Sequence, residues 1–139
     1  MSSKNYDILA PENKNGENKM KLIIKSKQDY GTHVDEFNEE MECIKTELET
    51  STLLTFQEGN IEIEDDRITY IRGENVMEIT RGEITDFEMS TQEGSINMQI
   101  EGLVVERNKA EKGVLAKTKY KLIITEDSAY TNELELYYE

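Results

Sequence analysis

The sequence has little of what marks secreted, metal-binding or membrane-spanning proteins. Its 139 residues include one cysteine, one histidine, one proline and no tryptophan. The single Cys43 excludes an internal disulfide, and the single His33 excludes a histidine-rich metal site. No apolar run approaches the roughly 20 residues that a membrane-spanning helix needs. The first residues lack the apolar segment of about 7–15 residues found in signal peptides, so we expect a cytoplasmic location.

Positive charge is also scarce. The chain has 16 Lys and Arg against 30 Asp and Glu, a net charge of −14. Because binding to nucleic acids and anionic membranes depends on clustered Lys and Arg, we expect neither partner. Mutual repulsion between such chains favours a monomer or at most a weak homodimer. The hydrophobic residues, 36% of the total, are patterned along the chain, which favours a folded domain over disorder.

The clearest pattern lies between residues 112 and 125, which read KGVLAKTKYKLIIT. Small or apolar residues occupy the even positions from Ala116 to Ile124, and Lys117, Lys119 and Lys121 occupy odd positions between them. Successive side chains of a strand point to opposite faces, so this alternation predicts one buried face and one lysine-lined face. It is typical of an antiparallel sheet with one face in water.

A second alternating stretch runs from Ile96 to Val105. Ile96, Met98, Ile100 and Val104 occupy one face, and Gly102 interrupts that apolar row. Glycine inside a strand often marks a bulge or a sharp bend, which a curling sheet needs. We therefore expect the strand to bend at Gly102.

Turn signals separate short strands along the rest of the chain at intervals of about 8–12 residues, a spacing typical of sandwiches and barrels. We count nine or ten strands, and consecutive hairpins close most naturally into a barrel without exposed edges. The sequence thus predicts an all-β fold, a single antiparallel up-and-down barrel of about 8–10 strands, over residues 20–139. Residues 1–19 are polar and contain the only proline, so we expect a flexible tail there.

Residues 33–48 fit two structures equally well. Phe37, Met41, Ile44 and Leu48 have the spacing of an amphipathic helix, and the stretch is rich in Glu, Met and Lys, which favour helix. The same residues also fit a strand. The local pattern leaves the choice open.

Several short motifs in this order resemble the small bacterial YwiB-like proteins, a family without an established activity. They are LIIKS, DDRITYIRGENV, DFEMSTQEGSINMQI, the EKG turn before the strand that bears Tyr120, and the closing NELELYY. The resemblance covers residues 20–138. It implies a lipocalin-like (calycin-type) barrel, a strand rather than a helix at 33–48, and at most a capacity to hold a small, mostly apolar ligand.

The chain departs from that family in two turns. The family usually has Arg-Ser-Gly where this chain has Arg72-Gly73-Glu74, so we expect a different turn geometry. The family also usually has an aromatic residue and Gly before the next strand. Here Thr91-Gln92-Glu93-Gly94 precedes it, which predicts a longer loop.

Five residues form the candidate ligand site: Tyr70, Arg72, Met98, Tyr120 and Leu122. Ile68, Tyr70 and Arg72 share a face, so Arg72 is expected at the mouth of the barrel, where its planar fork suits a carboxylate or phosphate. The alternative is that Arg72 pairs with an internal carboxylate or points into water. A barrel of about eight strands is wide enough either for a cavity or for a filled core. The side chains that would either line the cavity or fill the core are Met77, Phe87, Met89, Met98, Tyr120 and Tyr138.

Catalysis and metal binding find little support. Glu62, Glu64, Asp65 and Asp66 are acidic, but the first two belong to a solvated strand face and the calcium-loop pattern is absent. His33 and Cys43 are ten residues apart, roughly 33 Å along an extended strand. We therefore expect no enzyme activity, no metal and no cofactor.

Two functions remain. The first is binding of a small apolar molecule, with or without an anionic end, inside the barrel. The alternative is a non-catalytic protein-interaction module with a packed barrel, acting through its acidic surface or by adding a partner strand to an exposed edge. An open cavity favours the first, and a filled interior favours the second.

Overall fold

The computed structural model describes residues 19–139, which form ten antiparallel strands in one sheet. This confirms the predicted all-β fold. Lys19 already belongs to the first strand, and the rest of the predicted tail lies outside the described residues. The strands are β1 (Lys19–Asp29), β2 (Val34–Glu47), β3 (Thr52–Phe56), β4 (Gly59–Ile63), β5 (Arg67–Arg72), β6 (Asn75–Thr80), β7 (Ile84–Thr91), β8 (Gly94–Arg107), β9 (Gly113–Thr125) and β10 (Ser128–Tyr138).

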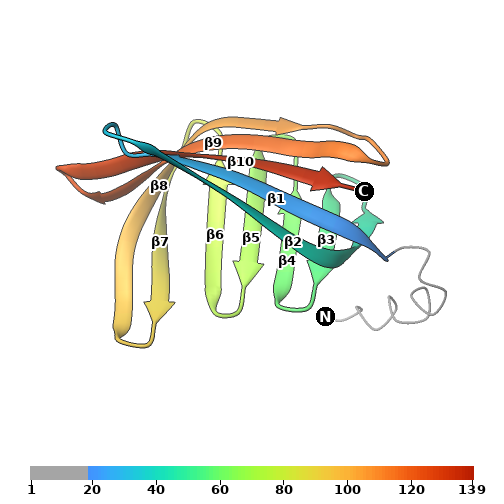
Figure 1. The fold of residues 1–139 in the computed structure, drawn as a ribbon, viewed down its shortest axis with the longest axis horizontal. Helices are drawn as coiled ribbons and strands as arrows, with labels where there is room; N and C mark the ends of the chain where they lie inside the picture. The colour runs from blue at the N-terminus through green and yellow to red at the C-terminus, as the bar shows by residue number, and fades with distance from the viewer. Residues whose placement is uncertain (1–18) are drawn as a thin grey trace.

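The strand order is β6-β5-β4-β3-β2-β1-β10-β9-β8-β7. Each pair of neighbours is also consecutive in the chain, except that the first strand pairs with the last, from Leu22 beside Tyr138 to Asp29 beside Thr131. The sheet curls until β6 and β7 face each other (Figure 1). The result is a nearly closed up-and-down barrel whose seam lies in the middle of the chain.

Individual hydrogen bonds hold the seam between β6 and β7 in place of a strand ladder. At one end the Gly82 N–H, in the turn between β6 and β7, donates to the carbonyl of Gly102 on β8 at 2.9 Å. Near the middle the Thr85 hydroxyl donates to the carbonyl of Glu78 at 2.8 Å. At the other end the Ser90 N–H donates to Oδ1 of Asn75, also at 2.9 Å. The seam is therefore joined at separate points.

The predicted bend at Gly102 is confirmed, because the register between β8 and β9 shifts between Gly102 and Val104. The extra residue reverses the alternation beyond it. Val105 is buried, with 2% of its surface exposed, while Val104 is 37% exposed. The expectation that Val104 shares the buried face is therefore wrong, because the bulge turns it outward.

Residues 34–47 form a strand, as the family resemblance implies, and the helical alternative is wrong. β1 pairs with β2 without interruption from Lys19–Ile44 to Asp29–Val34. This continuous pairing outweighs the local preference for helix. Phe37, part of the proposed helical stripe, is 52% exposed.

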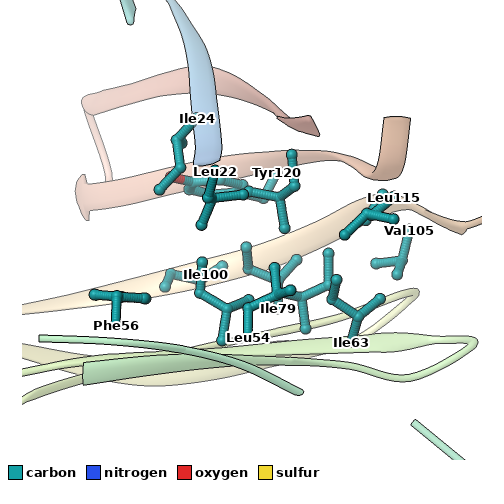
Figure 2. Close-up of a cluster of buried hydrophobic side chains, with 14 of the residues drawn as sticks. Leu22, Ile24, Leu54, Phe56, Ile63, Ile79, Ile100, Val105, Leu115 and Tyr120 are labelled. Carbon is teal, nitrogen blue, oxygen red and sulfur yellow. The ribbon is translucent and has the colours of Figure 1, made fainter. Parts of the chain in front are cut away.

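Apolar side chains from opposite sides of the barrel meet in its interior (Figure 2). Leu54, Ile63 and Ile79 come from β3, β4 and β6, and Ile100 and Leu115 come from β8 and β9. One continuous cluster also takes in Phe87, Met98, Tyr120 and Tyr138, with Met77 and Met89 packed at its margin. This part of the interior is filled by side chains.

No helix within residues 19–139 is both long enough and apolar enough to cross a membrane.

Candidate functional site

The structure places the five predicted ligand-site residues on inward-facing positions of three strands. Met98 on β8 and Tyr120 and Leu122 on β9 are buried in the core cluster. Tyr70 on β5 is partly buried and packs against that cluster, and Arg72 ends the same strand. Tyr70 and Arg72 are brought together, since Nη1 of Arg72 donates to the Tyr70 hydroxyl at 3.3 Å. Whether these residues bind a ligand stays a prediction.

The guanidinium of Arg72 is held between two carboxylates. Nη1 donates to Oε1 of Glu39 at 3.0 Å, Nη2 donates to Oε2 of the same carboxylate, and Nη2 also donates to Oε1 of Glu58 at 2.8 Å. The hydrogen bond from Arg72 lowers the pKa of Glu39, and the bonds to Glu39 and Glu58 raise the pKa of Arg72. This geometry matches the alternative in which Arg72 pairs with an internal carboxylate.

Sequence reasoning missed Glu39 as a partner because it lies in the ambiguous stretch. Once that stretch is a strand, Phe37, Glu39 and Met41 share one register, and Glu39 lies beside the buried Ile24. The strand interpretation therefore brings a carboxylate to the inner side of β2, within reach of Arg72.

A buried polar pair lies in the interior. Nδ2 of Asn132 on β10 donates to the hydroxyl of Tyr120 at 3.0 Å, and both residues are 5% exposed. Oδ1 of Asn132 is buried and has no hydrogen-bond partner among the described residues. A buried acceptor without a donor costs about 1–3 kcal/mol, and such exceptions require an explanation.

The surroundings of this pair are apolar and aromatic. Burial raises the pKa of Tyr120, and the nearby Tyr130 and Tyr70 act in the same direction. Tyr70 contacts Phe56 edge to face, with ring centroids 6.3 Å apart. Further partly buried apolar residues pack around the cluster, namely Met41, Met77, Met89, Tyr130 and Leu134. Asn132 alternates with Leu134 and Leu136 along β10, and this position on an apolar face is the sequence signal that identifies it.

A hollow of about 620 Å³ opens where β3 stops pairing with β2. Met41, Cys43 and Phe56 contribute apolar surface, and Glu58 lies at its edge. Burial raises the pKa of the Cys43 thiol to about 12, so the thiol stays protonated and is a poor nucleophile near neutral pH.

A second hollow, of about 500 Å³, lies on the outer face of the long strands and is lined by alternating lysines and glutamates. Lys25 and Lys117 lie on either side of Glu135, at 3.8 and 3.7 Å. The charges of this surface largely neutralise one another.

Three carboxylates of the acidic cluster are already engaged by other side chains. Glu62 accepts a hydrogen bond from Ser51 at 2.8 Å, and Glu64 pairs with Arg67 at 2.8 Å. Asp65 pairs with Arg107 at 3.3 Å. Residues 19–139 contain no group of three or more His, Cys, Asp or Glu side chains placed to hold a metal ion. His33 directly precedes β2, and Cys43 lies ten residues further along that strand.

Comparison with known proteins bears on the fold. No protein-family model matches the chain, and no curated protein matches it. Among solved structures, the fold is similar to that of the ywiB protein from Bacillus subtilis, with a TM-score of 0.66 over 86% of this chain and 91% of that chain. The two sequences are 8% identical, so the similarity shows a shared fold. The resemblance to YwiB-like proteins is confirmed at that level.

Proposed function

We propose that the protein binds a small, mostly apolar molecule that carries a hydrogen-bond donor. The observation that carries this proposal is the buried Oδ1 of Asn132 beside Tyr120, which has no hydrogen-bond partner within residues 19–139. Small-molecule sites typically combine apolar and aromatic surfaces with a few polar groups that fix the orientation of the ligand. A ligand N–H or O–H at Oδ1 would satisfy the amide and complete the hydrogen bonding of the pair.

Methionine and aromatic side chains support an apolar ligand body. Met77 and Met89 at the margin of the core are partly buried and lie near the seam between β6 and β7. The core cluster is filled by side chains, and this by itself favours the interaction module over a ligand held in an open cavity. Methionine adapts its shape readily, so these positions suit a ligand that enters by displacing side chains. Because the seam is joined by separate hydrogen bonds, it is the part of the barrel best suited to admit such a molecule.

An anionic end on the ligand is a secondary feature of the proposal. The Arg72 fork is already paired with Glu39 and Glu58, so an anion would have to displace a carboxylate. Glu58 is the more exposed of the two side chains and the easier to displace. Recognition therefore rests first on the hydrogen bond that a ligand N–H or O–H would donate to Oδ1 of Asn132.

A matched pair of fluorescent probes tests this function. N-phenyl-naphthylamine has one N–H donor, and benzylnaphthalene has a methylene group in its place. We expect the protein to bind the amine about tenfold more tightly, the value of roughly one net hydrogen bond. Asn132→Leu should bind both probes equally, while a substitution at the neighbouring Glu133, which is exposed on the opposite face of β10, should keep the preference.

Equal affinity of the wild-type chain for the two probes, or no binding of either, would remove the proposed function. Native mass spectrometry of protein purified gently from its own host supplies an independent check. A reproducible small-molecule adduct that is lost on unfolding, and absent from Asn132→Leu, would support the proposal and give the mass of the ligand.

A further inference from the structure

Strand β2 extends well beyond the end of its neighbour β3. β3 pairs with β2 only from Ile44 to Glu47, whereas β1 pairs with it from Val34 to Ile44. Within the described part of the chain, residues 34–43 therefore have a strand on one side only. We call the other side the open edge of β2.

The backbone groups at the open edge follow from the register. The Tyr30 N–H donates to the His33 carbonyl at 3.0 Å, so the odd-numbered residues of β2 direct their N–H and C=O groups toward β1. Glu36, Asn38 and Glu40 direct theirs to the open edge. A row of unpaired backbone donors and acceptors is a template for an added strand.

The open edge leads to the hollow of about 620 Å³. Met41, Cys43 and Phe56 give it an apolar lining. A peptide paired with residues 34–41 would end beside this hollow and place one side chain there. Strand addition typically draws affinity from main-chain hydrogen bonds and specificity from such pockets. The hollow therefore suits an apolar anchor residue.

The charge of the edge selects the partner. Residues 34–43 contain five acidic residues and no Lys or Arg: Asp35, Glu36, Glu39, Glu40 and Glu42. Lys21 on β1 lies 3.5 Å from Glu40, but both side chains are largely exposed. Glu39 is already paired with Arg72. The acidic charge of the edge therefore rests on Glu36 and Glu40, because an exposed pair such as Lys21–Glu40 contributes little.

We propose that the open edge of β2 binds an extended, basic segment of a partner protein as an added antiparallel or parallel strand, with an apolar residue in the hollow. Pairing of β2 with β2 of a second copy would place acidic side chains opposite one another, which is unfavourable. The inference is independent of the small-molecule site, because it uses the edge of the sheet and not Asn132.

The test uses the full chain and a synthetic peptide of alternating Lys and Val that ends in Leu. Amide hydrogen exchange is followed by NMR, and affinity by fluorescence anisotropy. We expect exchange at Glu36, Asn38 and Glu40 to slow by about tenfold or more when the peptide is bound, since paired amides exchange only on opening. A peptide with Glu in place of Lys should give no protection.

Two variants sharpen the assignment. Glu36→Lys combined with Glu40→Lys should weaken peptide binding by about tenfold or more, because it reverses charge at the docking edge. The matched control is Glu88→Lys combined with Glu133→Lys, which changes the net charge equally elsewhere. Asn38→Pro removes one edge N–H, and proline is tolerated on strand edges, so it should abolish protection while the chain stays folded.

Several outcomes would overturn the proposal. One is that the peptide gives no protection at the three amides. Another is that both charge-reversal variants weaken peptide binding equally. A third is that a peptide N-methylated at alternate residues binds as tightly as the unmethylated peptide. Concentration-dependent dimerisation that Asn38→Pro abolishes would assign the edge to a second copy. Faster exchange at the three amides on removal of residues 1–18 would assign it to the chain's own N-terminal segment.

Discussion

Arg72 on β5 and Glu39 on β2 form a two-armed ion pair across the opening beside β2. The residues are 33 apart in sequence, and β3 and β4 lie between their strands in the sheet. Glu58, from the turn between β3 and β4, joins the same guanidinium at 2.8 Å. The part of β2 that lacks a neighbouring β3 is thus fastened to the rest of the barrel by side chains.

The Arg72–Glu39 pair should stabilise β2 locally more than the whole fold. Both side chains are partly exposed, so Arg72→Met and Glu39→Gln should each lower the free energy of unfolding by at most about 1 kcal/mol. Amide exchange in residues 36–40 should nevertheless become faster. A double-mutant cycle should show coupling between the two residues, and none between Lys25 and Glu135 at 3.8 Å. Additive effects of Arg72→Met and Glu39→Gln would contradict this role.

Arg72 also offers a test of the anionic end of the proposed ligand. Arg72→Ala should weaken the binding of anilinonaphthalene sulfonate and leave that of the neutral N-phenyl-naphthylamine unchanged, because only the sulfonate competes for the guanidinium. Titrations with both probes, monitored by fluorescence, make the comparison. Equal loss for the two probes would remove Arg72 from the site.

Gly102 should be intolerant of any side chain. A Cβ at this position would lie 2.1 Å from the carbonyl oxygen of Thr80 and 3.2 Å from the N atom of Arg81, both backbone atoms that cannot rotate away. Gly102→Ala should therefore cost about 3 kcal/mol or more, at the upper end of overpacking effects, and should open the seam at β6. Urea unfolding measures the loss. The control is Gly73→Asn, where nothing lies near and Asn tolerates the positive φ of 61°.

Alkaline pH should destabilise the fold through Cys43. Burial raises the pKa of its thiol from 9.0 to about 12, so above about pH 9 the unfolded chain releases a proton that the folded chain keeps. The stability that this thiol provides is present below pH 9 and declines by about 1 kcal/mol per pH unit above it. Between neutral pH and about pH 10, the urea midpoint of unfolding should fall less for Cys43→Val than for the wild type. An equal fall would exclude Cys43 as the cause.

Local alternation predicted the barrel because each strand has one wet face. The rows from Ala116 to Leu122 and from Met98 to Ile100 identify inward positions, while Ile96 is 46% exposed; Gly102 identifies the bend. The seam between β6 and β7 was not predictable, since alternation tells which face a residue occupies and not which strand lies beside it. A local pattern likewise does not predict that the first strand pairs with the last.

The inward orientation of the candidate-site residues was predictable for the same reason. Tyr70, Met98, Tyr120 and Leu122 face inward as their register indicates. The partners that define their chemistry come from distant strands, so sequence spacing did not reveal them. The partner of Arg72 also depended on whether residues 33–48 form a strand, which is settled by pairing with β1.

The Tyr120–Asn132 pair should cost stability in the free protein, and this cost distinguishes a binding site from a structural bond. Tyr120→Phe alone leaves the amide of Asn132 without its one partner and should destabilise the fold by about 1–3 kcal/mol. Combining it with Asn132→Leu replaces both groups by apolar ones of similar shape, so the double variant should be at least as stable as the wild type. Urea unfolding measures all three chains, with Tyr137→Phe on the opposite face of the sheet as the control. A double variant less stable than Tyr120→Phe would show that the pair stabilises the fold. The buried Oδ1 of Asn132 would then no longer support a ligand-binding site.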